Sequence, residues 1–253
     1  MTRPYALDIL VPSRGRPHSI HRLIRAISDT AAHPERIRVM VRTDDDDPAQ
    51  DQYFRMPPAP GWMITRGPRI RLAESWNEQA AQAAENGVTT HLALWGDDVI
   101  PVTPGWDRTF IERLDQDGPG FVYGRDGVWD HTFNQSVPGH LVLPTAVVMP
   151  IEVYRALGWI APAGLIHLCI DVAWRDLGIA CDALHYEPGV FIRHFHRLCG
   201  APDDATYREA NDSSAQVNAD NRAFRAWRES DRFELDRGNL LRLREKWIAE
   251  QEA

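Results

Sequence analysis

The feature that most limits what this chain can fold into is a short apolar run that ends at two acids. Residues 92–95 (LALW) have the length and composition of a buried strand, and Gly96 ends the run before Asp97 and Asp98. Like charges at a strand end repel each other and resist the loss of water, so they need a cation or a hydrogen-bond network. Mg²⁺ and Mn²⁺ take oxygen ligands and commonly join one or two carboxylates to substrate phosphates. The run therefore predicts a divalent-metal and diphosphate site at a strand end, with a solvated turn as the alternative.

Composition and charge indicate a folded, soluble chain. Of its 253 residues 43% are hydrophobic and 25% are charged, so the chain is long enough to bury a substantial core and too apolar to be disordered. The net charge of −8, with histidines counted as neutral, gives no overall attraction to nucleic acid or to an anionic membrane. A local basic groove is still compatible with that charge.

Cysteine usage and hydropathy bear on the compartment. Cys169, Cys181 and Cys199 are odd in number and form no CxxC pair, so we expect no disulfide framework and a reducing environment. The first residues contain no long apolar stretch of the kind found in secretory signals, and no window approaches the roughly 18 apolar residues that a membrane span needs. We expect a cytoplasmic protein without a membrane partner.

A second apolar segment, at residues 7–11 (LDILV), is expected to be a strand that Pro12 ends. Ser13 and Arg14 follow it, together with further glycine, arginine and proline residues in the loop PSRGRP. Ligands of open α/β sheets bind outside the carboxyl ends of the strands, and arginine favours bidentate contact to phosphate. The loop predicts a phosphate-binding turn, with a solvated basic turn as the alternative.

A third apolar segment, at residues 37–41 (IRVMV), leads into four successive aspartates at residues 44–47. A solvated acidic turn is the default interpretation for most of this run. An acid at the end of a sheet strand can also accept hydrogen bonds from a base or from a ribose hydroxyl. Asp44 and Asp45 are the members expected to face a ligand, and a second cation site is another use for them.

Helical periodicity fills the gaps between these strands. Apolar residues at helical spacing predict helices over residues 20–27 and 71–84, and a short strand is expected at residues 62–65. Arg69, Arg71 and Asn77 lie near the start of the second helix, where they are placed to approach a phosphate or a sugar. Surface solvation is the alternative for each of them.

In the second half, one strand carries a pair of histidines. His194 and His196 are at positions i and i+2 of the strand expected at residues 186–195, so both rings are expected on one face, which makes them better metal candidates than a lone histidine. The same pattern analysis predicts a helix at 106–114, strands at 121–123 and 141–149, and amphipathic helices within 221–252 that pack on the core or on a second copy of the chain.

The order of these parts resembles the nucleotide-sugar-binding half of GT-A glycosyltransferases, in particular the large inverting (family 2-like) group. A strand ending in PSR, a strand ending in acids, a helix reading RLAESWNEQA and a strand ending in GDD follow one another as in that family. There are two departures: Glu78 follows Asn77 where the family helix has glycine, and the metal motif is GDD in place of Asp-x-Asp. By register with the family motif, the resemblance implies that Asp98 binds the metal and that Asp97 lies nearer the sugar or ribose.

Residues 151–178 extend the resemblance. The family has here a short helix, a Gly-aromatic turn, a loop, and an acid that opens a helix ending in R-x-x-G, and this order is matched around Asp171. In the family that acid is the general base, so the resemblance implies this role for Asp171. An acid before an apolar helix is also a typical N-cap, and the two roles can coexist. A histidine often completes the metal shell in these enzymes, which implies His194 or His196 as a ligand and favours Mn²⁺ over Mg²⁺.

The resemblance implies an α/β fold of the GT-A type, with a Rossmann-like, mostly parallel sheet flanked by helices and a C-terminal helical extension. Residues 1–200 would form the GT-A-like catalytic domain, and residues 201–253 a loop and helical extension in which Asp204 and Tyr207 are further candidates for donor contact. The residues implied to hold the donor nucleotide and sugar are Pro12, Ser13, Arg14, Asp44, Asp45, Arg69, Asn77 and Asp97.

The activity implied is transfer of a sugar, with inversion, from a nucleoside diphosphate sugar to an acceptor hydroxyl, with uridine as the favoured nucleoside and Mn²⁺ or Mg²⁺ as the cofactor. We expect a monomer or homodimer. The acceptor is open, and a modified base in phage DNA is one candidate for which Arg16, Arg22, Arg25, Arg69 and Arg71 would supply a local basic path. A nucleotidyltransferase, which should have a richer glycine loop than PSRGRP, and a non-catalytic nucleotide- or carbohydrate-binding protein are the alternatives.

Overall fold

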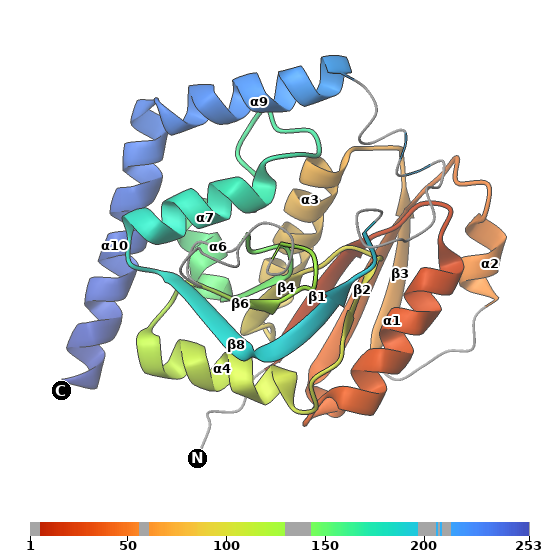
Figure 1. Ribbon diagram of the computed structural model, residues 1–253, viewed down its shortest axis with the longest axis horizontal. Helices are drawn as coiled ribbons and strands as arrows, with labels where there is room; N and C mark the ends of the chain where they lie inside the picture. The colour runs from red at the N-terminus through yellow and green to blue at the C-terminus, as the bar shows by residue number, and fades with distance from the viewer. Residues whose placement is uncertain are drawn as a thin grey trace.

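A single mixed sheet forms the centre of the molecule (Figure 1). The computed structural model describes residues 6–55, 61–129, 143–196, 206, 208 and 214–252, and Asp204 and Tyr207 lie outside these residues. Within the described residues the sheet has eight strands in the order β3-β2-β1-β4-β7-β6-β8-β5. Their bounds are β1 (Leu7–Pro12), β2 (Ile37–Asp44), β3 (Trp62–Gly67), β4 (His91–Leu94), β5 (Val99–Pro101), β6 (Phe121–Arg125), β7 (Val147–Pro150) and β8 (Leu184–His194).

The two halves of the sheet differ in strand direction. In the N-terminal half β1 pairs in parallel with β2 and β4, and β2 pairs in parallel with β3. In the C-terminal half β7 is antiparallel to β4 and β6, β8 is parallel to β6, and β5 is antiparallel to β8. The predicted α/β fold with a helix-flanked sheet is confirmed, with a sheet that is parallel from β3 to β4 and mixed beyond β4.

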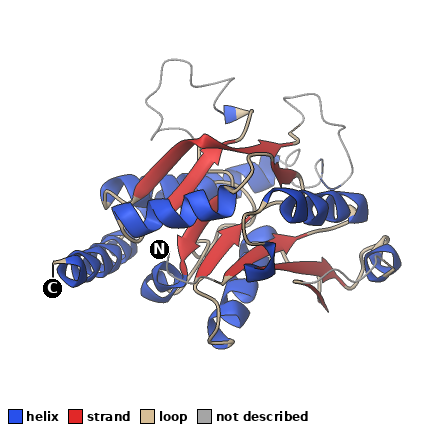
Figure 2. Cartoon of the chain, turned by 90° about the horizontal axis from the view of Figure 1, so that it is seen from below, coloured by secondary structure: helices blue, strands red, loops and turns tan. Residues whose placement is uncertain are grey.

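Helices lie on both sides of the sheet (Figure 2). The side chains of β1 alternate: Leu10 packs in a core with α3, α6 and α7, and Ile9 and Val11 pack in a second core with α1 and α4. Both faces of the sheet are therefore buried, which explains the nearly continuous apolar runs. The helices are α1 (Pro17–Thr30), α2 (Gln50–Phe54), α3 (Leu72–Glu85), α4 (Trp106–Asp117), α6 (Ile151–Leu157), α7 (Ile170–Ala180), α9 (Ser214–Arg228) and α10 (Asp231–Gln251), with a short 3₁₀ turn η1 (Pro34–Arg36).

The expected strand at 141–149 is shorter in the structure. Strand β7 begins at Val147, and the described residues just before it lie outside any strand. Pro144 cannot donate a ladder hydrogen bond, and the Thr145 hydroxyl donates to Asp126 Oδ2 at 2.9 Å. A proline and a side chain with a polar partner therefore replace the first part of the expected strand.

The two C-terminal helices share the core of the sheet domain. Phe233 and Leu240 of α10 and Trp227 of α9 are buried in the same cluster as Trp174 of α7. Figure 1 shows α10 running beside α6 and α7, with α9 meeting its N-terminal end. Among the described helices, none combines the length and apolar character that crossing a membrane requires.

Candidate active site

A cavity of about 520 Å³ opens at the carboxyl ends of β1, β2 and β4. This volume is in the range of small-molecule and cofactor sites. The cavity brings together ten of the predicted site residues from segments far apart in the chain. They are Pro12, Ser13, Arg14, Asp44, Arg69, Asp97, Asp98, Asp171, His194 and His196.

Asp97, which follows β4, is buried and connects the end of this strand to the loop after β1. Its Oδ2 accepts a hydrogen bond from Ser13 Oγ at 2.7 Å, and its Oδ1 accepts one from Arg16 Nη1 at 2.9 Å. The Tyr53 hydroxyl lies 2.8 Å from Ser13 Oγ and accepts from the Arg16 backbone N–H at the same distance. The loop after β1 is therefore fixed to the acid at the end of β4.

Burial and charge act differently on the two adjacent acids. Burial raises the pKa of Asp97 to about 6, although the Arg16 guanidinium opposes the shift. Burial also acts to raise the pKa of Asp98, but His194 and Arg16 outweigh it, and the pKa falls below its ordinary value. Asp98 is the more firmly ionised of the two, which suits a metal ligand.

The strand pair β5–β8 brings Asp98 to His194. Val99 pairs with His194 in the antiparallel register, and the Phe195 N–H donates to the Asp98 carbonyl at 2.7 Å. As a result Asp98 Oδ2 lies 3.5 Å from His194 Nε2. Burial lowers the pKa of His194, but Asp98 and Asp126 together raise it to about 10.

The described residues contain no group of three His, Cys, Asp or Glu side chains arranged around one point, and a divalent ion could bind Asp98 and His194 only by displacing the proton that Asp98 and Asp126 favour on the His194 ring. Neighbouring ligands of an octahedral ion with bonds of about 2.1 Å lie about 3.0 Å apart, close to the 3.5 Å of this pair. His196 lines the same cavity, with its ring centroid 5.2 Å from that of His194. Mg²⁺ and Mn²⁺ sites of this kind draw their other ligands from water and substrate phosphates.

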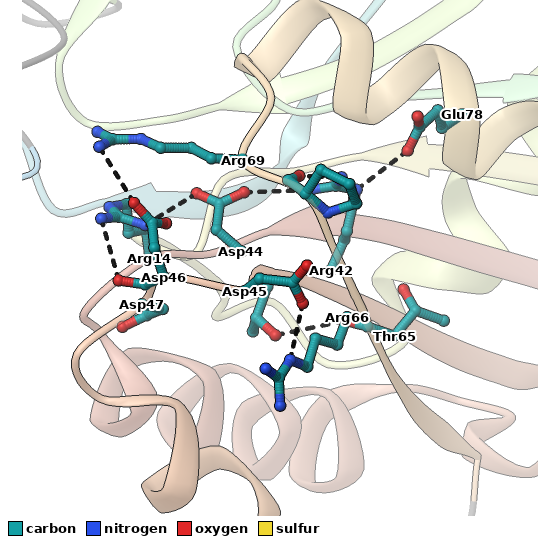
Figure 3. Close-up of polar contacts among 12 residues, drawn as sticks. Arg14, Arg42, Asp44, Asp45, Asp46, Asp47, Thr65, Arg66, Arg69 and Glu78 are labelled. Carbon is teal, nitrogen blue, oxygen red and sulfur yellow. Dashed lines mark hydrogen bonds and ion pairs between the residues drawn. The ribbon is translucent and has the colours of Figure 1, made fainter.

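Arginines pair with three of the four aspartates at the end of β2 (Figure 3). Asp44 contacts Arg14 Nη1 at 3.2 Å and Arg42 Nη1 at 3.1 Å, and it is nearly buried. Asp46 forms ion pairs with Arg14 and, at 3.5 Å, with Arg69. Asp46 is exposed and lies in the turn after β2, as the prediction of a solvated acidic turn has it, whereas Asp44 is nearly buried.

The other two acids of the run have structural partners. Asp47 accepts the Gly15 N–H at 2.8 Å and so holds the loop after β1. Asp45 does not line the cavity, because its carboxylate forms an exposed ion pair with Arg66 at 2.7 Å (Figure 3). Of the two acids expected to face a ligand, Asp44 lines the cavity and Asp45 does not.

Asn77 also lies outside the cavity lining. Its Oδ1 accepts the N–H groups of Ile160 at 2.6 Å and Ala161 at 3.1 Å, and its Nδ2 donates to the Ala161 carbonyl at 3.1 Å. All these bonds tie α3 to the loop before α7. Asn77, the asparagine of the helix motif that resembles the GT-A family motif, therefore fixes the backbone of the loop before α7 in this chain.

Asp171 is in the first turn of α7 and lines the cavity. Burial raises the pKa of its carboxyl group, and the Val172 N–H, which donates to Oδ1 at 2.8 Å, opposes the shift. The N-cap position belongs to Cys169, so Asp171 is not itself the N-cap. The residue is partly exposed, it lines the cavity, and the pKa of its carboxyl group is raised, as suits a proton acceptor.

Several residues of the site carried no motif. Arg42 pairs with Asp44, and the Tyr53 hydroxyl is hydrogen-bonded to Ser13. Asp126 lies beside His194, and Thr206 Oγ1 donates to the Arg14 carbonyl at 2.9 Å. Only Asp126 had a usable signal, because it follows the strand at 121–123 as the other site acids follow theirs.

The fold is similar to that of solved glycosyltransferases. Mannosyltransferase PcManGT from Pyrobaculum calidifontis, in complex with GDP-Man and Mn²⁺, matches with a TM-score of 0.58 and 11% identity, over 99% of this chain and 76% of that chain. S. aureus TarS matches with a TM-score of 0.59 and 9% identity in its UDP-GlcNAc complex, over 93% of this chain and 70% of that chain. In the UDP complex of TarS the match has a TM-score of 0.53 and 10% identity, over 74% of this chain and 60% of that chain.

No family model matches the sequence, and no curated protein matches it. The structural matches show the fold, which is the GT-A-like fold of nucleotide-sugar glycosyltransferases. The expected fold class is therefore confirmed.

Proposed function

We propose that this chain is a glycosyltransferase that moves a sugar from a nucleoside diphosphate sugar to an acceptor hydroxyl, with inversion and with help from a divalent metal ion. One observation carries the proposal. A single cavity is lined by the loop after β1, by the arginine-held acids Asp44 and Asp97 at the ends of β2 and β4, by the Asp98–His194 pair, and by Asp171.

The donor would bind along the strand ends. Arg14 and Arg69, whose guanidinium groups are paired with Asp46, would offer N–H donors to the diphosphate, and Pro12, Ser13 and Asp44 line the same cavity. Asp97, held by Ser13 and Arg16, would face the ribose or the sugar. We leave Asp45 and Asn77 out of the donor site because neither lines the cavity. Uridine is the proposed nucleoside, and guanosine is the competitor because PcManGT was solved with GDP-Man.

Asp98 and His194 would hold the metal ion, with His196 as the neighbouring imidazole. The ion, when bound, neutralises charge that develops on the leaving diphosphate, a role worth several kcal/mol in metal enzymes as a rough guide. Mn²⁺ is the proposed ion because imidazole suits it better than Mg²⁺. Mn²⁺ is also the ion found with GDP-Man in PcManGT.

Asp171 would be the general base. The acceptor oxygen attacks the anomeric carbon while its proton passes to the Asp171 carboxylate, and the bond from that carbon to the diphosphate oxygen breaks with its electron pair. Attack opposite to the leaving group inverts the anomeric configuration. A carboxylate with a raised pKa accepts this proton more readily than an ordinary one.

The acceptor is a hydroxyl on a small molecule or glycan in the main version of this proposal. The net charge of −8 disfavours long contacts with DNA, and Arg16 and Arg69, two arginines of the proposed basic path, form ion pairs with Asp97 and Asp46. A DNA acceptor with a modified base is the narrower version. Strongly salt-dependent binding of duplex DNA would support it, and the absence of binding at low salt would exclude it.

The first experiment is a thermal-shift panel of UDP, GDP, UDP-GlcNAc and GDP-Man, each with Mn²⁺ and with EDTA. A ligand at 100 times its Kd stabilises the native state by about 2.7 kcal/mol, which raises the Tm of a chain of this size by about 5 °C or more. We expect such a shift for at least one nucleotide, only with Mn²⁺. Asp98→Asn should abolish it, and the matched variant Asp45→Asn, outside the cavity, should keep it. Metal-independent shifts, or none at all, would contradict the proposal.

A further inference from the structure

A buried carboxylate of the C-terminal helix α9 holds the loop that leads to Asp171. Asp220 has no exposed surface and accepts three consecutive backbone N–H groups, from Ile166 at 2.6 Å, Leu168 at 3.0 Å and His167 at 3.3 Å. Charge-assisted bonds to a carboxylate are stronger than bonds between neutral groups. Among the described residues no arginine or lysine forms an ion pair with Asp220, so these amides are its main partners.

The loop is also held in a conformation that it would not adopt by itself. Cys169 has a φ of 65°, which is uncommon for a residue with a side chain and persists only where the surroundings impose it. The Cys169 Sγ lies 3.7 Å from Asn221 Oδ1 on α9, and the Ile166 carbonyl accepts the Ala73 N–H of α3 at 3.1 Å. The loop is therefore set by α9 on one side and α3 on the other.

The conformation of this loop decides where α7 begins. Cys169 is the N-cap of α7, and its carbonyl accepts the Ala173 N–H at 2.9 Å, so Asp171 falls in the first turn. His167, Leu168 and Cys169 line the cavity together with Asp171. A shift of the loop would reorient the first helical turn of α7 and so move the Asp171 carboxyl group.

We propose that Asp220 is a positioning residue: by binding the amides of residues 166–168 it fixes the direction in which Asp171 faces the cavity. This inference rests on the proposed function, since Asp171 is the proposed base. It also gives the C-terminal helices a part in the active site, because α9 supplies the carboxylate.

The test is Asp220→Asn, which keeps the size of the side chain but replaces one acceptor oxygen by a donor group. Hydrogen exchange should become at least 10-fold faster at the amides of Ile166 and Leu168, and at Val172, whose N–H reports on the Asp171 carboxyl group. Hydrolysis of UDP-GlcNAc or GDP-Man with Mn²⁺ should show kcat at least 10-fold lower and KM for the donor changed less than twofold. The control is Glu229→Gln, exposed just beyond the end of α9, which should leave all these values unchanged.

The outcomes separate this inference from the proposed function. If the amides of Ile166, Leu168 and Val172 exchange in Asp220→Asn at the same rates as in the wild type, the positioning inference is overturned. Equal losses in kcat and donor affinity would also overturn it, because they mark a general structural role. If the wild type hydrolyses neither donor, the proposed function loses support while the exchange rates still decide the positioning. If the variant does not fold, the wild type decides: these amides must exchange as slowly as that of Leu10 in β1, and fast exchange would overturn the inference.

Discussion

Asp97 illustrates, at the scale of single residues, how the burial of one acid can reduce stability. Its pKa is about 6 in the folded state because burial disfavours the charged form, against about 3.9 in an unfolded chain. The folded state therefore binds the proton more tightly than the unfolded state. The stabilisation that comes from the protonated Asp97 carboxyl group is fully present below about pH 4 and is lost as the pH rises through 6. At neutral pH the ionised carboxylate of Asp97 therefore lowers the stability of the folded state.

We predict that Asp97→Asn raises the free energy of unfolding at pH 7.5, in EDTA, by at most about 3 kcal/mol, because asparagine resembles the neutral form. The gain should shrink towards pH 4, and nucleotide binding should weaken. Urea denaturation over this pH range measures the effect. Asp98→Asn is the matched control with the opposite sign: the pKa of Asp98 is lowered, so its carboxylate adds stability at neutral pH that is lost on acidification. Equal losses in both variants at pH 7.5 would contradict the argument.

Asp171→Asn should separate binding from turnover. The amide cannot accept the acceptor proton, so turnover should fall by about 10²–10⁴-fold while donor affinity stays the same. In the wild type, kcat should rise with pH through the raised pKa of Asp171, since the base acts when ionised. Asp182→Asn, fully exposed just beyond the end of α7 and outside the cavity lining, is the control that should keep full activity. Unchanged turnover in Asp171→Asn would remove this residue from the mechanism, whereas nucleotide binding without turnover in the wild type would leave a binding protein as the better interpretation.

At the scale of elements, local patterns predicted the first half of the site and long-range pairings decided the rest. Parallel strands end at the same edge of a sheet, so the polar residues after β1, β2 and β4 had to converge. The contact between Asp98 and His194 depends on the pairing of β5 with β8, about 95 residues apart, for which the sequence has no local signal. Asn77 was assigned by motif alone, although the loop that its side chain reaches is set by tertiary packing.

The anchoring of α10 gives a prediction at this scale. Asp236 is fully buried and accepts the indole N–H groups of Trp159 at 3.1 Å and Trp227 at 3.0 Å, as well as Arg232 Nε at 2.8 Å. Asp236→Ala leaves these donors without an acceptor, so we expect a loss of about 3–5 kcal/mol in the free energy of unfolding. Urea denaturation followed by tryptophan fluorescence measures it. Glu234→Ala, exposed on the same helix, should cost less than about 0.5 kcal/mol, and a similar small cost for Asp236 would refute the anchoring.

The whole molecule raises the question of whether the C-terminal extension is a separate folding unit. The sequence suggested a boundary near residue 200, where a polar segment precedes amphipathic helices. Such helices need an apolar partner, but the pattern does not say whether that partner is the same chain or a second copy. In the structure the buried face of α10 completes the core over α6 and α7, with Trp227, Phe233 and Leu240 in contact with the cluster that contains Trp174.

We therefore predict that the chain unfolds in one cooperative transition. The calorimetric enthalpy should equal the van't Hoff enthalpy, and melting curves from tryptophan fluorescence and far-ultraviolet circular dichroism should coincide, because the C-terminal helices share a core with the sheet. A saturating nucleotide with Mn²⁺ should move the whole transition to higher temperature without splitting it, since a ligand of the native state stabilises every part that unfolds with it. Deletion of residues 214–252 should leave a chain with no cooperative transition, because it exposes the apolar faces of α6 and α7. Two resolved transitions, or a truncated chain with the wild-type Tm, would show that the C-terminal extension folds separately. The contact of Asp220 on α9 would then be the link between the extension and the cavity.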